Sequence, residues 1–178
     1  MKVRIASTLL ALALPALAGC TPNVPSTRYL GTPMFVVADL QPAALNGPWY
    51  EIARFPFAPQ EGCRRTTATY AARADGLIAV DNRCEIGGTV RRSTGTAQLV
   101  GPGRLKVALE GVPFRGDYWV LGLSRDRRTL VVGTPSRVAG WVLHRDRQMT
   151  PFQIDDARDL FDRNGYDAAA LQRTDQRR

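Results

Sequence analysis

The sequence predicts an all-β protein followed by one α-helix, and three observations carry this prediction. Runs rich in β-branched and aromatic residues recur about every ten to twelve residues between positions 49 and 145. Turn signals such as Asp75-Gly76 and Gly101-Pro102-Gly103 separate these runs. The apolar spacing then changes to a helical period after Thr150. Eight antiparallel strands at such spacing are typical of a sandwich or an up-and-down barrel.

The expected strands follow from this alternation along the chain. In residues 49–57 aromatic and aliphatic side chains alternate with a Glu and an Arg, which predicts a first strand. The next two runs flank Asp75-Gly76 and predict a β-hairpin. The eight expected strands are residues 49–57, 65–73, 77–84, 89–100, 104–111, 117–124, 129–135 and 139–145.

The C-terminal region predicts a helix that begins at Thr150 and ends at Gly165. Thr150 is suited to the N-cap and Pro151 to the first turn, while Gly165 favours termination. Residues 168–174 are apolar enough for a ninth short strand.

The N-terminus reads as an export signal that ends in a lipid-attachment site. Lys2 and Arg4 precede an apolar run that is too short for a comfortable membrane span, which disfavours an uncleaved anchor helix. Residues 17–20, Leu-Ala-Gly-Cys, resemble the lipobox of bacterial lipoproteins, in which the Cys thiol is acylated. The resemblance implies a signal peptide at 1–19, lipid attachment at Cys20 and, because residue 21 is Thr, sorting to the outer membrane. The remaining divisions are then a lipidated tether at 20–38, a domain at 39–172 and a basic tail at 173–178.

The three cysteines fit this interpretation. An odd number of cysteines in an exported protein requires an explanation, and Cys20 would take the lipid. Cys63 and Cys84 then remain in an oxidising compartment, on the flanks of the expected hairpin. We expect a disulfide between them; the alternative is two unrelated free thiols.

The strand pattern resembles that of the lipocalins, and most closely the lipoprotein lipocalins of the bacterial outer membrane and apolipoprotein D. The family's Gly-x-Trp motif corresponds to Gly47-Pro48-Trp49, and the Arg that ends the family's last barrel strand corresponds to Arg145. The resemblance implies a closed eight-stranded antiparallel up-and-down barrel with one C-terminal α-helix. One family motif is not matched. Where the family has Thr-Asp-Tyr, residues 123–125 are Leu-Ser-Arg, and an aspartate, Asp126, follows one position later than in the family motif.

The resemblance assigns structural roles at the base of the barrel. It places Arg145 on the face of Trp49, with Gly47 beside it; the alternative is a simple core Trp with a solvated Arg. Strand alternation directs His144 outward and Glu51 inward. A carboxylate inside a barrel requires a partner, so Glu51 either anchors the barrel floor, which we favour, or orients a ligand.

The same alternation predicts which side chains line a cavity. The predicted ligand-binding residues are mostly apolar and include two Tyr hydroxyls: Ala53, Phe55, Ala68, Tyr70, Leu77, Tyr118, Val120, Val131, Trp141 and Leu143. Such a set suits a ligand that has a hydrocarbon chain and a modest polar end.

The predicted function is therefore binding and storage or transport of a small hydrophobic ligand, such as a fatty acid or lysophospholipid. The expected location is the bacterial outer membrane, with the domain anchored by the N-terminal lipid and facing the periplasm. The alternative is a structural or interaction lipoprotein of the envelope, with a packed barrel and no ligand. The sequence leaves a homodimer open.

Other classes of function find little support in the sequence. The net charge of +8 is spread over scattered Arg pairs rather than a block, so no nucleic-acid partner is expected. A single His excludes a His-based metal site or a familiar catalytic triad, and no cofactor motif occurs. Catalysis by a cavity thiol would require Cys63 or Cys84 to be free.

Overall fold

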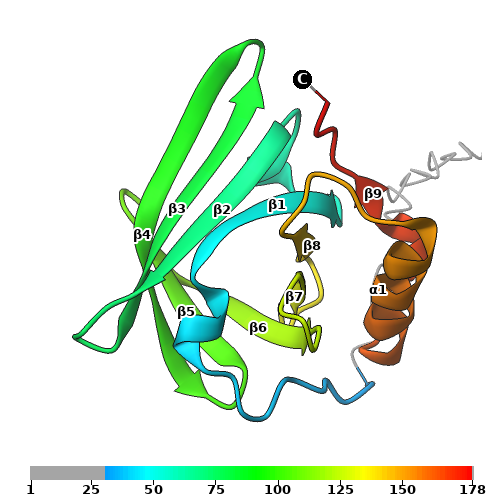
Figure 1. The fold of residues 1–178 in the computed structure, drawn as a ribbon, viewed down its shortest axis with the longest axis horizontal. Helices are drawn as coiled ribbons and strands as arrows, with labels where there is room; N and C mark the ends of the chain where they lie inside the picture. Colours follow the sequence, from blue (N-terminus) through cyan, green and yellow to red (C-terminus); the bar gives the residue numbers. More distant parts are fainter. Residues whose placement is uncertain (1–30, 178) are drawn as a thin grey trace, which may run out of the picture.

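Eight antiparallel strands close into a barrel because β1 pairs with β8 on one side and with β2 on the other. The structure is a computed structural model that describes residues 31–177. Figure 1 shows the strands following one another around the barrel. The barrel strands are β1 (Gly47–Arg54), β2 (Arg64–Ala72), β3 (Leu77–Ile86), β4 (Thr89–Gly101), β5 (Arg104–Leu109), β6 (Arg115–Leu123), β7 (Thr129–Gly133) and β8 (Gly140–His144). The predicted eight-stranded up-and-down barrel is confirmed.

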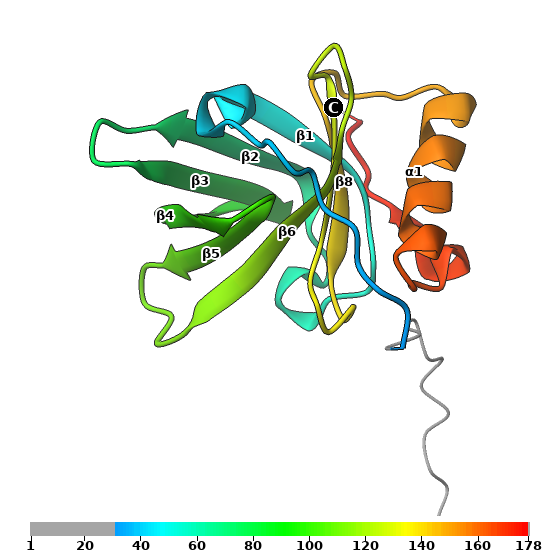
Figure 2. The same ribbon diagram turned by 90° about the horizontal axis from the view of Figure 1, so that it is seen from below.

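Helix α1 (Pro151–Arg163) lies outside the barrel, against the side that carries β8 (Figure 2). Thr150 caps it, since its hydroxyl accepts from the Gln153 amide while the Gln153 side chain accepts from the Thr150 amide. Gly165 follows at a positive φ of 78°, where a residue with a Cβ would be strained. The helix expected between Thr150 and Gly165 is confirmed.

Three short 3-10 helices and a ninth strand complete the described part of the chain. Strand β9 pairs with the end of β1, in the segment where a ninth short strand was expected. These elements are η1 (Pro42–Leu45), η2 (Ala58–Gln60), η3 (Ala168–Ala170) and β9 (Gln172–Arg173).

Two apolar clusters lie on opposite faces of the same strands. The inner cluster lies inside the barrel and contains Trp49, Leu105 and Val120. The outer cluster lies between the barrel wall and α1 and contains Ile154 and Phe161 from the helix. Strands covered on both faces are therefore apolar on both faces.

The segments on either side of the predicted domain also contact the barrel. Before η1, the Val37 amide donates to the Val120 carbonyl at 2.9 Å. After β9, the Thr174 amide donates to the Ile52 carbonyl at 2.9 Å. The expected signal peptide at 1–19, Cys20 and most of the expected tether lie outside the described residues.

Candidate ligand-binding cavity

Trp49 closes one end of the barrel. It is fully buried, and its indole Nε1 donates to the Leu45 carbonyl of η1 at 2.7 Å. The Arg145 guanidinium lies 3.6 Å from the centroid of the Trp49 ring, which is cation–π geometry. Arg145 also donates to the carbonyls of Pro48 and Asn46, at 2.9 and 2.8 Å. Gly47 lies beside it at a φ of +93°, where an added Cβ would lie 3.3 Å from Arg145 Nη1.

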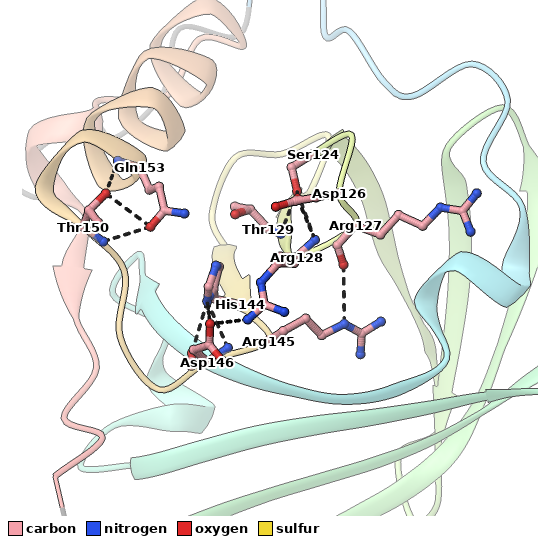
Figure 3. A network of polar contacts seen from close by, with 10 residues as sticks. All are labelled: Ser124, Asp126, Arg127, Arg128, Thr129, His144, Arg145, Asp146, Thr150 and Gln153. Carbon is pink, nitrogen blue, oxygen red and sulfur yellow. Dashed lines mark hydrogen bonds and ion pairs between the residues drawn. The ribbon is translucent and has the colours of Figure 1, made fainter.

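The turn between β6 and β7 at this closed end is built around Ser124 and Asp126 (Figure 3). The Ser124 hydroxyl donates to Asp126 at 2.6 Å, and the Arg128 amide donates to the same carboxylate at 3.1 Å. These two hydrogen bonds hold the pKa of Asp126 below its usual value. The carboxylate one position late in the motif therefore still closes the turn, and Arg145 donates to the Arg127 carbonyl of that turn.

His144 faces away from the barrel interior but is buried. The residue is 3% exposed, and its Nδ1 accepts from the Asp146 amide at 3.0 Å, as Figure 3 shows. The predicted outward direction is consistent with the neighbouring Leu143 in the inner cluster. The part of the chain that the structure describes holds no group of three or more potential metal-ligating side chains.

A cavity of about 660 Å³ occupies the barrel above Trp49, within the size range of small-molecule sites. Its inner part is apolar, with Leu45 from η1 and Ile78, Ala97 and Leu105 from the strands. The loops after β1, β5 and β7 line it at the opposite end from η1, so this end is the mouth. Five of the predicted ligand-binding residues line it: Ala68, Tyr70, Tyr118, Trp141 and Leu143.

The other five predicted residues do not line the cavity. Val120 belongs to the inner cluster and is fully buried, but it is not among the residues that line the cavity. Ala53 and Phe55 were placed inside wrongly, because a β-bulge between Glu51 and Ala53 reverses the alternation. Phe55 instead packs outside the barrel against Phe161 of α1, with the two ring centroids 4.8 Å apart.

Leu77 and Val131 were also placed inside wrongly. In β3 the inward residues are Ile78 and Val80, one position away from the predicted face. In β7 they are Leu130 and Val132, whereas Val131 belongs to the outer cluster. Each error is a shift of one residue, which reverses every side chain of a strand.

Glu51 lines the cavity wall, and three side chains contact its carboxylate. Glu51 is 2% exposed. Its Oε1 accepts from Arg54 Nη1 at 2.6 Å and from the Thr174 hydroxyl at 2.6 Å. Its Oε2 accepts from Gln60 Nε2 at 3.0 Å. Arg54 reaches Glu51 because the bulge brings both onto one face of β1, so the sequence alone did not identify this partner.

The same network joins the C-terminus to the cavity wall. Gln60 Oε1 accepts from the indole of Trp141 at 2.6 Å, and Arg54 Nη2 donates to the carbonyls of Gln60 and Cys63 at 3.1 Å. Gln176 Nε2 donates to the Glu51 carbonyl and to the Thr66 carbonyl, and so joins β1 to β2 where they separate. Glu51 is thus held as a wall anchor.

Cys63 and Cys84 form a disulfide, with their Cα atoms 5.4 Å apart. The bond joins the loop after β1 to β3 at the mouth of the cavity. The predicted pairing is confirmed, and neither thiol is free in this structure.

The hydroxyls of Tyr70 and Tyr118 meet inside the cavity. Their oxygen atoms are 2.8 Å apart, and Tyr118 stacks on Trp141 with ring centroids 6.2 Å apart. Burial raises the pKa of Tyr70 to about 12 and that of Tyr118 well above its usual value. Both phenols are therefore uncharged at neutral pH.

A closed antiparallel barrel with a plug at one end and a ligand-sized apolar cavity at the other defines a binding protein for small hydrophobic molecules. The chain belongs to the lipocalins: the model of the lipocalin-like domain matches residues 41–176. Members of this family bind small hydrophobic ligands and are generally not enzymes.

Relatives from plants, bacteria and animals share this domain. The chain is 36% identical to temperature-induced lipocalin-1 of Arabidopsis thaliana, over 80% of this chain and 83% of the relative. It is 34% identical to the outer membrane lipoprotein Blc of Escherichia coli K12, over 83% of this chain and 76% of that protein. It is 29% identical to apolipoprotein D of Macaca fascicularis, over 94% of this chain and 95% of that protein.

Solved structures show the same fold at lower identity. The structure resembles insecticyanin from the tobacco hornworm Manduca sexta with a TM-score of 0.66 at 17% identity, over 80% of this chain and 84% of that one.

Within residues 31–177 no helix combines the length and apolar character that crossing a membrane would require.

Proposed function

We propose that this lipocalin binds a single-chain lipid, a fatty acid or a lysophospholipid, in its barrel and stores or carries it in the bacterial envelope. The observation that carries the proposal is the cavity of about 660 Å³, apolar within and lined at its closed end by Leu45 of η1. The cavity also weighs against the alternative of a packed barrel that serves only as a surface for protein contacts.

Burial of the hydrocarbon chain would supply the binding free energy. Each methylene transferred from water contributes about 0.8 kcal/mol, so twelve buried methylenes contribute about 10 kcal/mol before the cost of association. The aliphatic wall formed by Ile78, Val80, Leu105 and Val107 is suited to such a chain. Catalysis is not part of the proposal, since the one thiol pair at the cavity is a disulfide.

Arginines at the mouth support an anionic head group. Arg83, Arg91 and Arg92 line the outer part of the cavity on the β3–β4 hairpin. Arg83 and Arg92 share Asp81, at 2.9 and 3.0 Å, whereas Arg91 forms no ion pair among the described residues. We expect the affinity for anionic lipids to fall with added salt, and an affinity independent of salt would contradict this assignment of the head group.

The membrane location rests on the N-terminus and on the relatives. Blc of Escherichia coli is an outer membrane lipoprotein by name, and this chain carries Cys20 in a lipobox-like sequence. We infer that acylated Cys20 anchors the domain to the outer membrane, facing the periplasm. Mass spectrometry of the N-terminal peptide should find acylated Cys20, and Cys20→Ala should release the domain into the soluble periplasmic fraction.

Exposed apolar side chains surround the mouth and fit this location. Val112, Phe114 and Val138 are 38%, 71% and 46% exposed beside the cavity opening. They would face the membrane surface from which a lipid is taken up, or bury against a second copy in a homodimer.

The proposal is tested by the lipids that purify with the protein. Mass spectrometry of an organic extract from native protein should detect single-chain lipids near one mole per mole of protein. The matched control is Ala97→Phe, which places a ring inside the cavity beside Val107 of β5 and should remove them. Absence of bound lipid from both proteins, together with no uptake of added lipid, would overturn the proposal.

A further inference from the structure

Two phenols span the barrel interior and form a hydrogen bond, which we call the phenol bridge. Tyr70 lies on β2 and Tyr118 on β6, strands that are on opposite sides of the barrel (Figure 1). Their oxygen atoms are 2.8 Å apart, and both side chains line the cavity. Tyr70 pairs with Gly47 near the closed end, and Tyr118 stacks on Trp141 further out, so the bridge crosses the barrel between the closed end and the mouth.

The phenol bridge contains one more hydrogen than it uses. Two hydroxyls carry two hydrogens, and a hydrogen bond between their oxygens uses one of them. Among the described residues neither hydroxyl has any other hydrogen-bond partner. One O–H hydrogen therefore has no acceptor among residues 31–177, and an unpaired buried donor is unfavourable unless the cavity contents accept it.

The charges near the phenol bridge disfavour an anionic acceptor. Burial is the main cause of the raised pKa of Tyr70, and the charge of the Glu51 carboxylate adds to it. The arginines of the cavity wall lie instead on the β3–β4 hairpin at the mouth. A carboxylate or phosphate at the bridge would lose its hydration without an arginine in contact with either phenol among the described residues, whereas an uncharged oxygen needs only a donor.

We propose that the phenol bridge is a subsite for an uncharged oxygen atom, a hydroxyl, ketone or ester carbonyl, at the end of the ligand that enters the barrel first. The inference rests on the proposed function and narrows the class of ligand. It favours a chain that is oxygenated at its inner end and anionic at its outer end over a plain fatty acid. The outer charge then lies near Arg91 and the inner oxygen accepts the free phenolic hydrogen.

Paired ligands and paired variants test this subsite. Palmitic acid and its omega-hydroxy derivative differ only in a terminal hydroxyl, and their affinities are measured by calorimetry for each protein. The variants are Tyr70→Phe, Tyr118→Phe and the double variant, which removes both hydroxyls. The matched control is Tyr50→Phe. Tyr50 packs against the outer cluster, so this substitution removes the same hydroxyl group outside the cavity.

The double variant should change the preference between the two ligands. The ratio of omega-hydroxy to plain affinity should fall about tenfold between the wild type and the double variant, because the ligand hydroxyl then lacks a partner. Each single variant keeps one hydroxyl and should keep most of the preference, and Tyr50→Phe should leave it unchanged. Affinity for palmitic acid should be equal or higher in the double variant.

The outcomes separate this inference from the proposed function. If the wild type binds palmitic acid but the ratio is the same in the double variant, the subsite is overturned while lipid binding stands. If neither ligand binds the wild type, the proposed function itself fails. Circular dichroism and thermal unfolding of each variant verify that the barrel is folded.

Discussion

Replacement of Arg54 by Met should destabilise the barrel strongly, because it leaves the Glu51 carboxylate buried without its cation. Glu51 is 2% exposed, and the Arg54 side chain is 14% exposed, so water screens this pair little. Arg54 makes four hydrogen bonds that Met cannot replace, to Glu51, Thr174 and the carbonyls of Gln60 and Cys63.

The expected loss in the free energy of unfolding is about 3–5 kcal/mol, the range for removing one partner of a buried ion pair. For a domain of this size that loss lowers Tm by about 10 °C. Urea unfolding followed by tryptophan fluorescence, with the disulfide intact, measures it directly.

The double variant Arg54→Met/Glu51→Leu supplies the control. If the cost comes from an unpaired buried charge, removal of that charge should recover part of the stability lost in Arg54→Met. A loss below about 1 kcal/mol in Arg54→Met, or a double variant less stable than Arg54→Met, would refute the reasoning.

The remaining predictions concern the base, the mouth and the interior. Gly47→Ala should cost about 1–2 kcal/mol in urea unfolding, because its φ is +93° and the new Cβ would crowd Arg145; an unchanged midpoint would contradict the described turn. Replacement of Cys63 and Cys84 by Ala should cost about 3 kcal/mol by the same measurement, since it frees a loop of 21 residues in the unfolded chain, and an equal midpoint would count against that account. The pKa of Tyr70 is raised to about 12, so its contribution to stability should be complete below pH 10 and lost as pH rises towards 12. Phenolate absorbance measured against pH checks this, and ionisation of all five tyrosines near pH 10 in folded protein would disprove it.

Strand alternation predicted the first strand correctly as far as Glu51 and failed beyond it. The inward positions of Trp49 and Glu51 follow from the two-residue period. The bulge after Glu51 depends on how β1 pairs with β8, which no local pattern in β1 reveals. The same bulge hid both the outward turn of Phe55 and the pairing of Arg54 with Glu51.

The errors at Leu77 and Val131 have a different cause. Leu77 and Ile78 are both apolar, so the start of β3 does not show which of the two faces inward. In β7 the run Leu130, Val131, Val132 is apolar throughout, because the inner cluster covers one face and α1 the other. Such a strand has no alternation to read. The motif-based roles of Gly47, Trp49 and Arg145 needed no register, and the contacts at the closed end agree with them.

Fluorescence titration of lipid into delipidated protein tests ligand binding in the barrel most directly, because Trp141 lines the cavity. We predict a saturable change with palmitic acid or lysophospholipid for the wild type and for Gln98→Phe, which adds the same ring to the exposed neighbour of Ala97. Ala97→Phe, with the ring inside the cavity, should abolish or greatly weaken the change. Equal titration curves for Ala97→Phe and Gln98→Phe, or no saturable change in the wild type, would contradict binding within the barrel.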